Sequence, residues 1–554
     1  PSAAEWARLE RSVGGHLIEG TPLFSACEAD RTSAACADVI ANVKNPFFIG
    51  DQNGGTELCG WLDAWTPRPS AYVVAARTTG DVVAAVNFAR DHNLRLVVKG
   101  AGHSYQGTSN APDSLLVWTR WMNSVTVHDA FVPKGADPEN GMPAVSAEAG
   151  AVWMDLYDAV TTKAGRYVQG GGCADVGVAG LIQSGGFGVY SKGFGTAAAS
   201  LLEAEIVTAD GKVRVVNTND DPDLFWAIKG GGGGSWGVVT RLTLRTHDLP
   251  PFFGGSWGKI EARSDTAYHK LIARFFDFYQ NSLLNPHWGE QVFFGPGNRI
   301  ELSMACVGLT RHEVKAVWQP FFEWVDAAPQ DYRVTTPLGA GVWPSRNQWN
   351  LAVNKDIVPD PRPGAPSHHG WWRDDQGEAG AFIYGYDSLW LPKSLLGTSE
   401  LVDAMLTASR FKMVRCFFNK GLAGAPSDAI AATLKTATNP KVTEAFALAI
   451  IADGNERPAY PGQPGAHVDL DSARKDARAI DAAIEPLRKI APRSGSYVSE
   501  SNYFNARWQD EFWGANYPRL KVVKAKYDPD GLFFVHHGVG SEEWSPDGFT
   551  RLKG

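Results

Sequence analysis

Short apolar runs alternate with an amphipathic segment early in the chain. The runs AYVVAA (71–76) and LRLVVKG (94–100) are typical of buried strands, and DVVAAVNFARDHN between them has the period of an amphipathic helix. Thr78, followed three residues later by Asp81, has the spacing of a capping box. The pattern therefore predicts a strand–helix–strand unit.

The next stretch predicts a helix over 153–163, a strand at RYVQ and a hairpin over LLEAEIVTADGKVRVV. Asp210-Gly211 stands at the hairpin's centre, where positive φ angles are needed. Glycine is concentrated nearby, in GGGCADVGVAGLIQSGGFG (170–188) and KGGGGGSWG (229–237). A glycine inside a regular element costs about 0.5–1 kcal/mol relative to alanine. We therefore expect the backbone of these segments to approach another group closely.

From about residue 250 to residue 480, aromatic residues become frequent and long helical patterns appear at 265–280, 311–327 and 471–490. Turn signals such as GPGN (295–298) separate alternating runs between these helices. This pattern favours a second domain built on an antiparallel sheet with helices on one face. The last residues, from Tyr497, are again punctuated by glycine and proline.

Composition limits the class of protein. A chain of 554 residues is long enough for two large domains, and its 44% apolar and 20% charged residues exclude a disordered chain. The net charge is −8, and no run of Lys and Arg exceeds two residues, so we expect no nucleic-acid partner. No apolar stretch is long enough to predict a membrane span.

The cysteines suggest a compartment. Cys27 and Cys36 flank a polar segment and have a spacing that suits either a small disulfide loop or two free thiols, whereas Cys306 and Cys416 lie in apolar runs and are expected to be buried thiols. The chain begins at Pro1 without a methionine, which fits removal of a leader and equally a chosen start point. We expect a secreted or periplasmic protein.

Three glycine loops carry the candidate chemistry. In KGAGHSYQG (99–107) a buried strand enters a Gly-x-Gly turn followed by His103, and such a turn presents backbone N–H groups to an anion or forms an ordinary turn. A second loop contains Cys173, and the third is GGGGGSWG. Neither of the last two loops has a Gly-x-Gly-x-x-Gly in a strand-to-helix turn or the P-loop spacing. The combination favours a dinucleotide held mainly by backbone.

Two other patterns are weaker. The segment 233–237 matches Gly-x-Ser-x-Gly, but a helix-like run precedes it and a strand follows it, the reverse of a hydrolase elbow. The pairs His368-His369 and His536-His537 lack the spacing that turns two ligands toward one metal ion, so we expect no metal site.

The ordered motifs VVKGAGHSYQG, GGGCADVGVAGLIQSGGFG, VTADGKV, DLFWAIKGGGGGSWGVVTRLTL and NYPRLKVVKAKYDPDGLFF resemble the FAD-linked oxidases of the vanillyl-alcohol oxidase type, in the berberine-bridge-enzyme-like branch. The resemblance implies an α+β fold with a two-part, PCMH-type FAD-binding domain and an inserted substrate domain. The implied parts are an N-terminal FAD-binding part (1–250), a substrate-binding domain (251–480) and a C-terminal segment that completes the FAD domain (481–554).

The resemblance also implies bicovalent FAD, with His103 bonded to the 8α methyl carbon and Cys173 to the sixth ring carbon. Imidazole and thiolate are suitable nucleophiles, and a structural buried thiol is the alternative for Cys173. Ala174 and Asp175 follow Cys173 where Pro-Thr is commoner in the family. The implied cofactor contacts are His103, Cys173, Lys99, Gly100, Ala101, Gly102, Ser104, Gly107, Val176, Gly177, Gly180, Gly185, Gly186, Gly237, Val239, Asn516 and Tyr517.

Catalytic residues are implied at two places. Val176 falls where the family carries a gatekeeper for dioxygen, and a valine there leaves room for the gas. A proton acceptor is needed when an alcohol is oxidised, and the family often has Tyr-x-Asn-Tyr where this chain has Tyr497, with Ser499 and Glu500 in place of the Asn and second Tyr. We predict Tyr497 and Glu500 as the base. The alternative is that they contact only the edge of the flavin.

Glu290-Gln291, Tyr384 and Tyr386 are weaker candidates for substrate contact. The predicted function is an FAD-dependent oxidase that takes hydride from an alcohol, sugar or phenolic substrate and reduces dioxygen to hydrogen peroxide. The alternatives are a dehydrogenase with another acceptor and a flavin-holding protein without activity. The predicted partners are a small-molecule substrate and dioxygen.

Overall fold

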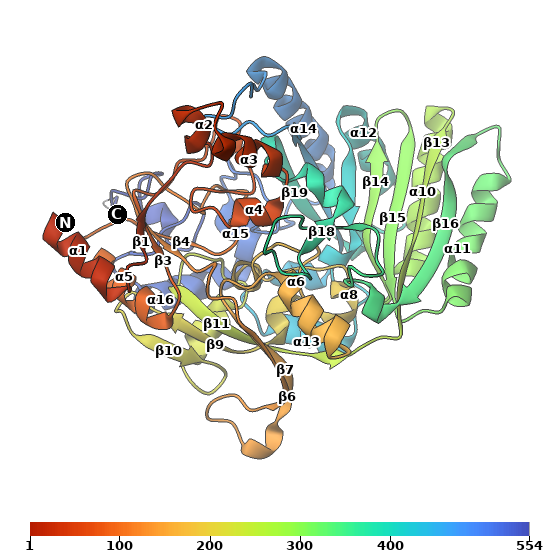
Figure 1. The fold of residues 1–554 in the computed structure, drawn as a ribbon. Coiled ribbons are helices and arrows are strands. Elements are labelled where there is room, and N and C mark those ends of the chain that lie inside the picture. The colour runs from red at the N-terminus through yellow and green to blue at the C-terminus, as the bar shows by residue number, and fades with distance from the viewer. Residues whose placement is uncertain (553–554) are drawn as a thin grey trace.

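The computed structural model describes residues 1–552. Figure 1 shows the N- and C-terminal parts together on one side of the molecule and a large sheet with its helices on the other. The two ends of the chain lie close to each other, as expected when both contribute to one domain.

A four-stranded sheet contains the first predicted unit. Its strand order is β1 (Leu17–Glu19), β3 (Tyr72–Ala75), β5 (Leu115–Trp118) and β4 (Leu96–Lys99). Helix α5 (Thr79–Asp91) connects β3 to β4, and Thr78 and Asp81 form its capping box. The predicted unit is confirmed, although β5 lies between its two strands and pairs with both in parallel.

A five-stranded antiparallel sheet follows. Its order is β10 (Val213–Val216), β9 (Leu201–Val207), β11 (Val238–Arg245), β7 (Met142–Glu148) and β6 (Val125–Phe131). The predicted hairpin of β9 and β10 is confirmed. The prediction that Asp210 and Gly211 both have positive φ is wrong, because only Gly211 of the two does, with a φ of 75°. Its N–H donates to the Thr208 carbonyl at 2.9 Å, so a single left-handed residue closes the loop.

The predicted helix over 153–163 consists of α6 (Trp153–Leu156) and a π-helical continuation, Tyr157–Lys163. Other α-helices, apart from those that cover the large sheet, are α1 (Ala3–Ser12), α2 (Ser25–Ala29), α3 (Ala34–Asn42), α4 (Pro46–Gly50), α7 (Val178–Gln183), α8 (Ser191–Phe194), α9 (Pro222–Ile228), α13 (Ser427–Leu434), α15 (Trp508–Trp513) and α16 (Tyr517–Tyr527). Two short strand pairs are also present, β8 (Arg166–Tyr167) with β12 (His247–Asp248) and β17 (Ile357–Pro359) with β18 (Gly370–Trp372).

The middle of the chain forms an eight-stranded sheet. Its order is β16 (Tyr332–Pro344), β13 (Phe252–Ala262), β15 (Arg299–Val307), β14 (Trp288–Gly295), β20 (Val414–Phe417), β21 (Ala445–Asn455), β19 (Phe382–Pro392) and β2 (Gly60–Trp61). Every pairing is antiparallel except that of β19 with β2. The predicted turn at 295–298 joins β14 to β15.

One face of this sheet carries the helices. These are α10 (Asp265–Phe278), α11 (Arg311–Asp326), α12 (Ser399–Phe411) and α14 (Leu470–Ile490). Along β14, Val292 and Phe294 join the buried core beneath them, whereas Gln291 and Phe293 line a cavity on the opposite face. This alternation is that of a strand with two different faces. The predicted α+β class and the antiparallel sheet with helices on one face are confirmed.

Two elements cross the predicted domain limits. Helix α14 continues through the limit at 480/481 and packs on β19 and β21 of the large sheet. Strand β2, from the N-terminal part, extends the same sheet at its edge. The division at residue 250 falls immediately before β13, the first long strand of this sheet.

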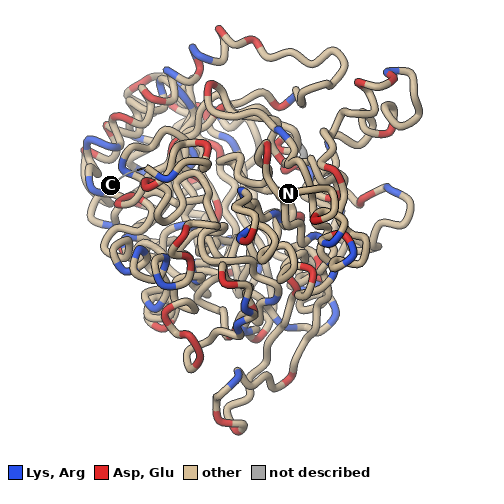
Figure 2. The backbone as a smooth tube through the Cα atoms, turned by 90° about the vertical axis from the view of Figure 1, so that its left-hand side faces the viewer, with Lys and Arg blue, Asp and Glu red and all other residues tan. Residues whose placement is uncertain are grey.

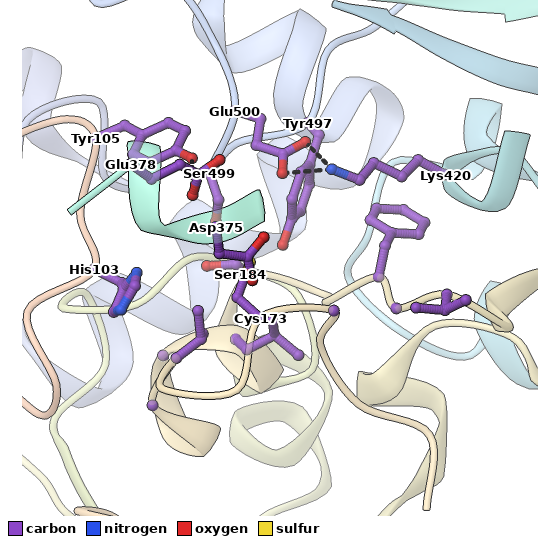
Figure 3. Close-up of a pocket in the computed structure, with 18 of the residues that line it drawn as sticks. His103, Tyr105, Cys173, Ser184, Asp375, Glu378, Lys420, Tyr497, Ser499 and Glu500 are labelled. Carbon is purple, nitrogen blue, oxygen red and sulfur yellow. Dashed lines mark hydrogen bonds and ion pairs between the residues drawn. The ribbon is translucent and has the colours of Figure 1, made fainter. Parts of the chain in front are cut away.

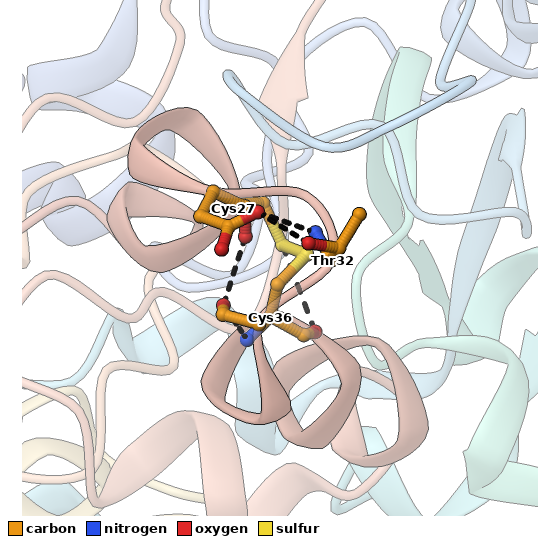
Figure 4. The surroundings of a disulfide bond; sticks show 5 residues. Cys27, Thr32 and Cys36 are labelled. Carbon is orange, nitrogen blue, oxygen red and sulfur yellow. Dashed lines mark hydrogen bonds between the residues drawn. A yellow bond between two sulfur atoms is a disulfide. The ribbon is translucent and has the colours of Figure 1, made fainter.

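Cys27 and Cys36 form a disulfide, which joins α2 to α3 (Figure 4). Cys306 and Cys416 are buried free thiols, as predicted, and so is Cys59. Basic and acidic residues are interspersed along the backbone (Figure 2). Among the described helices, none has the length and apolar character needed to cross a membrane.

Candidate active site

A cavity of about 1340 Å³ lies between the glycine loops and the open face of the large sheet. Typical small-molecule pockets have roughly 300–1,000 Å³, so this cavity has room for a cofactor together with a substrate. One wall is formed by the loop after β4, the loop around Cys173 and the loop before β11. The other is formed by β13, β14, β15, β16, β19, β20 and β21.

The glycine wall fits a group held by backbone. A Cβ built on Gly172 or Gly180 meets no atom within 4 Å, and one on Gly233 meets only the Cβ of Gln183, at 3.8 Å. All three residues line the cavity, so side chains at these positions would extend into it. The cavity thus provides the close backbone approach that the sequence predicts, and FAD fits this wall by shape and by donor chemistry.

Most predicted cofactor residues come together here. Those that line the cavity are Lys99, Gly100, Ala101, Gly102, His103, Ser104, Cys173, Val176, Gly177, Gly180, Gly237 and Val239. His103 and Cys173 lie on the same side of it, on separate loops (Figure 3). The Lys99 ammonium donates to the carbonyls of residues 52, 53 and 55, so this lysine fastens the N-terminal loop to the wall.

Five predicted cofactor residues lie outside the cavity lining. Gly107, Gly185 and Gly186 have positive φ, and a Cβ there meets Trp65, Thr438 or Leu181 at under 3.0 Å, so these glycines permit tight packing. The Asn516 amide donates to the carbonyls of residues 437 and 438. The Tyr517 hydroxyl donates to Glu542 at 2.7 Å. Asn516 and Tyr517 therefore hold the C-terminal segment in place and, like the three glycines, do not line the cavity. Contact of these five residues with the cofactor stays a prediction.

His103 is held by two carboxylates that have no local motif. Its Nε2 contacts Asp175 Oδ2 and lies 3.6 Å from Glu57 Oε2. Burial lowers the pKa of His103, but Asp175 and Glu57 outweigh this effect and raise the pKa to about 10. Burial raises the pKa of Glu57 to about 8.

Cys173 is surrounded by acidic groups. Burial raises the pKa of its thiol well above the usual value, and Asp375 and Glu378 raise it further. Burial and Glu378 likewise raise the pKa of Asp375. The thiol therefore stays protonated at neutral pH, and a bond from its sulfur to another group requires a proton acceptor. Asp375 lies beside the thiol (Figure 3).

Tyr497 and Glu500 line the same cavity. Burial raises the pKa of Tyr497, and Glu500 raises it further, while the ring packs edge-on against Phe187. Glu500 accepts two hydrogen bonds from Lys420, at 2.5 and 2.6 Å (Figure 3). The carboxylate is thus charge-paired, and Lys420 is positioned to lower the cost of a negative charge near Tyr497.

The sheet wall supplies residues that were only weakly predicted. Glu290, Gln291 and Tyr386 line the cavity. Glu290 has a φ of 59° within β14, a conformation that is costly for a non-glycine residue. Tyr384 lies outside the lining and is corrected: it is the extra residue at a register shift between Ile383 and Gly385, which removes it from the strand alternation.

Several residues of the site carry no sequence signal. They are Glu57, Asp375, Glu378, Arg415 and Lys420, brought together from distant segments. Asp175 had a partial signal, because the Ala-Asp after Cys173 departs from the family pattern. A contact of that carboxylate with His103 was not predicted.

The spacing of His368 and His369 predicted that their side chains do not turn toward one point, and this prediction is wrong. His368 Nε2 and His369 Nε2 both lie 2.9 Å from Asp155 Oδ1, because the chain turns between them. His369 Nδ1 is buried without a hydrogen-bond partner among the described residues, and imidazoles that bind metals nearly always donate through the second nitrogen. The cluster acts as a clamp between the 357–372 segment and α6.

Known proteins resemble this chain over its whole length. The family model for an FAD binding domain matches residues 69–217, and the model for berberine and berberine like proteins matches residues 486–540. The VAO-type flavoprotein oxidase VAO615 of Thermothelomyces thermophilus is 29% identical, with 100% of this chain and 93% of that protein aligned. The FAD-linked oxidoreductase ZEB1 of Gibberella zeae is 28% identical over 98% of this chain and 92% of its own length.

Solved structures show the same fold. VAO-type flavoprotein MtVAO615 from Myceliophthora thermophila C1 superposes with a TM-score of 0.79 at 25% identity, covering 99% of this chain and 97% of that one. A glucooligosaccharide oxidase from Acremonium strictum has a TM-score of 0.66 at 19% identity, covering 89% and 94%. Fold and site therefore define a flavoprotein that resembles the vanillyl-alcohol oxidase type, in its berberine-bridge-enzyme-like branch. This chain is an enzyme, an FAD-dependent oxidoreductase.

Proposed function

We propose that this enzyme is an oxidase that binds FAD covalently through His103 and Cys173, takes hydride from an alcohol-type substrate and reduces dioxygen to hydrogen peroxide. The observation that carries the proposal is the cavity itself. His103 and Cys173 open into it from separate loops of a glycine wall, and a wall of titratable side chains faces them. FAD, when bound, supplies the two-electron acceptor that no side chain provides.

The names of relatives support two parts of this proposal, the oxidase reaction and the covalent flavin. VAO615 is named a flavoprotein oxidase. The glucooligosaccharide oxidase of Acremonium strictum is described as carrying a 6-S-cysteinyl, 8α-N1-histidyl FAD. Other neighbours are named as chitooligosaccharide and xylooligosaccharide oxidases. Export from the cytoplasm belongs to the proposal as well, because the disulfide of Cys27 and Cys36 suits an oxidising compartment.

On the sheet wall the chain's own residues would bind substrate and take its proton. The aromatic residues there include Trp257, Phe293, Trp343 and Phe417, which suit sugars by stacking and phenolic rings equally well. Tyr497 stays the predicted proton acceptor, directly or assisted by Glu500 and Lys420. Val176, on the glycine wall, stays the predicted gate for dioxygen.

A panel of sugars, oligosaccharides and phenolic alcohols, assayed for hydrogen peroxide, tests the reaction. Steady peroxide formation with one class supports the oxidase. Flavin reduction by a substrate without peroxide would instead support a dehydrogenase with another acceptor, and no reduction by any class would support a flavin-holding protein. The covalent bonds are tested separately: His103→Ala and Cys173→Ala should each retain flavin after acid precipitation, and only the double variant should release it.

A further inference from the structure

Two buried carboxylates converge on one nitrogen of His103. Glu57 and Asp175 have side chains that are 4% and 6% exposed, and the His103 side chain is 14% exposed. Both carboxylates face Nε2. No hydrogen bond among the described residues involves Nδ1, and His103 lines the cavity. The two nitrogens of this imidazole therefore have different surroundings, acidic for Nε2 and open for Nδ1.

The three residues come from separate parts of the chain. His103 follows β4, Asp175 lies in the loop of Cys173, and Glu57 precedes β2. The loop of Glu57 is fixed at both sides, because its N–H donates to the Gly102 carbonyl at 3.2 Å and its carbonyl accepts from Gly380 at 2.7 Å. The carboxylates are thus built into the fold beside the imidazole and do not depend on a flexible side chain reaching it.

We propose that Asp175 and Glu57 are positioning residues for covalent attachment at His103, holding its Nε2–H so that Nδ1 faces the flavin and stabilising the positive charge that the ring then gains. This inference rests on the proposed flavin bond. A hydrogen bond to one imidazole nitrogen fixes the tautomer and leaves the lone pair on the other. Bonding of Nδ1 to carbon makes the ring cationic, and nearby buried carboxylates favour a cationic imidazole.

The bonding step balances as follows. The ring, which its raised pKa keeps cationic, first loses the proton on Nδ1 to water. A bond then forms between Nδ1 and the 8α carbon of the flavin, and one C–H bond of that methyl group breaks. Its proton leaves to water, and its two electrons stay in the flavin ring. Dioxygen then takes these two electrons and two protons and leaves as hydrogen peroxide, which restores the oxidised ring. Asp175 and Glu57 gain and lose no electrons.

The elevated pKa of His103 agrees with this role. The raised value reflects how strongly Asp175 and Glu57, with a smaller contribution from Glu378, favour the cationic ring over the neutral one. The same preference would stabilise the alkylated ring once it forms. The positioning role also gives a reason for Asp175, which places a carboxyl group two residues after Cys173 where the family more often has threonine.

The test uses a Cys173→Ala background, in which only His103 can hold flavin after denaturation. In that background Asp175→Asn keeps a side chain of the same shape and removes the carboxyl group, and Glu57→Gln does the same for the second carboxyl group. Asp374→Asn, at an exposed acidic residue of the cavity lining, is the matched control. For each full-length protein, total bound flavin and the fraction kept after acid precipitation are measured, with the flavin-linked peptide analysed for the bonded nitrogen.

We expect Asp175→Asn to lower the covalent fraction at least tenfold, since loss of a carboxylate that fixes a histidine costs about 10²–10⁴-fold in rate, while total flavin is kept. Residual attachment should be mixed between Nδ1 and Nε2, which a merely structural role would not produce. Glu57→Gln should lower the covalent fraction in the same way, to a smaller degree. If Asp175→Asn does not fold, Glu57→Gln alone tests the positioning role.

Equal covalent fractions in all variants, bonded at Nδ1 throughout, would overturn the positioning role while leaving the proposed function intact. Release of flavin from the Cys173→Ala protein itself would overturn the bond at His103, and the positioning role with it. Loss in the Asp374→Asn control as well would show that any acidic residue near the flavin has the effect, and this too would overturn the assignment.

Discussion

The two walls of the cavity are built on different principles. The glycine wall uses backbone from a few contiguous segments, and its essential property is the absence of side chains at positions such as Gly172 and Gly180. The sheet wall uses side chains that alternate along strands, such as Gln291 and Phe293 of β14. The cofactor wall therefore depends on local sequence, whereas the wall that would meet the substrate depends on the assembly of distant strands.

The largest expected effect is on the glycine wall. Gly180 lies in α7 with no atom within 4 Å of a built Cβ, so Gly180→Leu extends a side chain into the cavity and should abolish flavin binding. The melting temperature of the flavin-free protein should not fall, because leucine favours a helix by about 1 kcal/mol over glycine. Absorption spectra and thermal melts measure both.

The control is Gly80→Leu, at an exposed position of α5 outside the cavity lining. It should leave flavin content unchanged. Full flavin content in Gly180→Leu would show that this part of the wall does not approach the cofactor.

On the other side of the cavity, the next largest effect is expected at Tyr497. If its hydroxyl accepts the substrate proton, Tyr497→Phe should slow flavin reduction about 10²–10⁴-fold while binding survives, because ring packing against Phe187 is kept. Glu500→Gln, which breaks the charge pair with Lys420, should be compared in the same anaerobic stopped-flow experiment. A changed flavin spectrum with reduction slowed less than about tenfold would assign Tyr497 to positioning only.

A smaller effect on stability is expected from Glu290. Burial raises its pKa from 4.5 to about 7, with Lys420 opposing and Glu500 adding to the shift. Between pH 4.5 and about 7 the folded chain therefore keeps a proton on Glu290 that the unfolded chain has released. The protonated group costs no stability below pH 4.5, and stability is lost as the pH rises through about 7.

Glu290→Gln should accordingly match the wild type at low pH and exceed it above pH 7, by at most about 3 kcal/mol in the free energy of unfolding. Urea unfolding at several pH values measures the difference. Glu485→Gln, at an exposed residue of α14, should show no such trend. A pH-independent difference for Glu290→Gln would refute the raised pKa.

The smallest effect is expected at Val176, on the glycine wall. Val176→Leu lengthens a side chain that lines the cavity and should slow reoxidation of reduced flavin by dioxygen about tenfold, equivalent to about 1.4 kcal/mol in the barrier. Flavin reduction by substrate should change less. Equal slowing of both half-reactions would mean that Val176 is not a gate.

The difference between the walls also explains what the sequence could predict. The capping box of Thr78 and Asp81, the hairpin and the long helices follow from local patterns, and so does the gathering of His103 and Cys173 in glycine loops. Glu378 and Lys420 could not be found in this way, because each is an ordinary polar residue until the sheet brings it to the cavity. Asn516 and Tyr517 belong to a motif shared with the family, yet both lie outside the cavity lining, so the motif alone does not tell which of its residues line the cavity.

The most direct test of the account is the intact mass of the wild-type protein after denaturation. Two covalent bonds from His103 and Cys173 predict a mass that exceeds the bare chain by one FAD, and a yellow precipitate in acid. The bare mass of the chain, with all flavin released to the supernatant, would contradict the central claim.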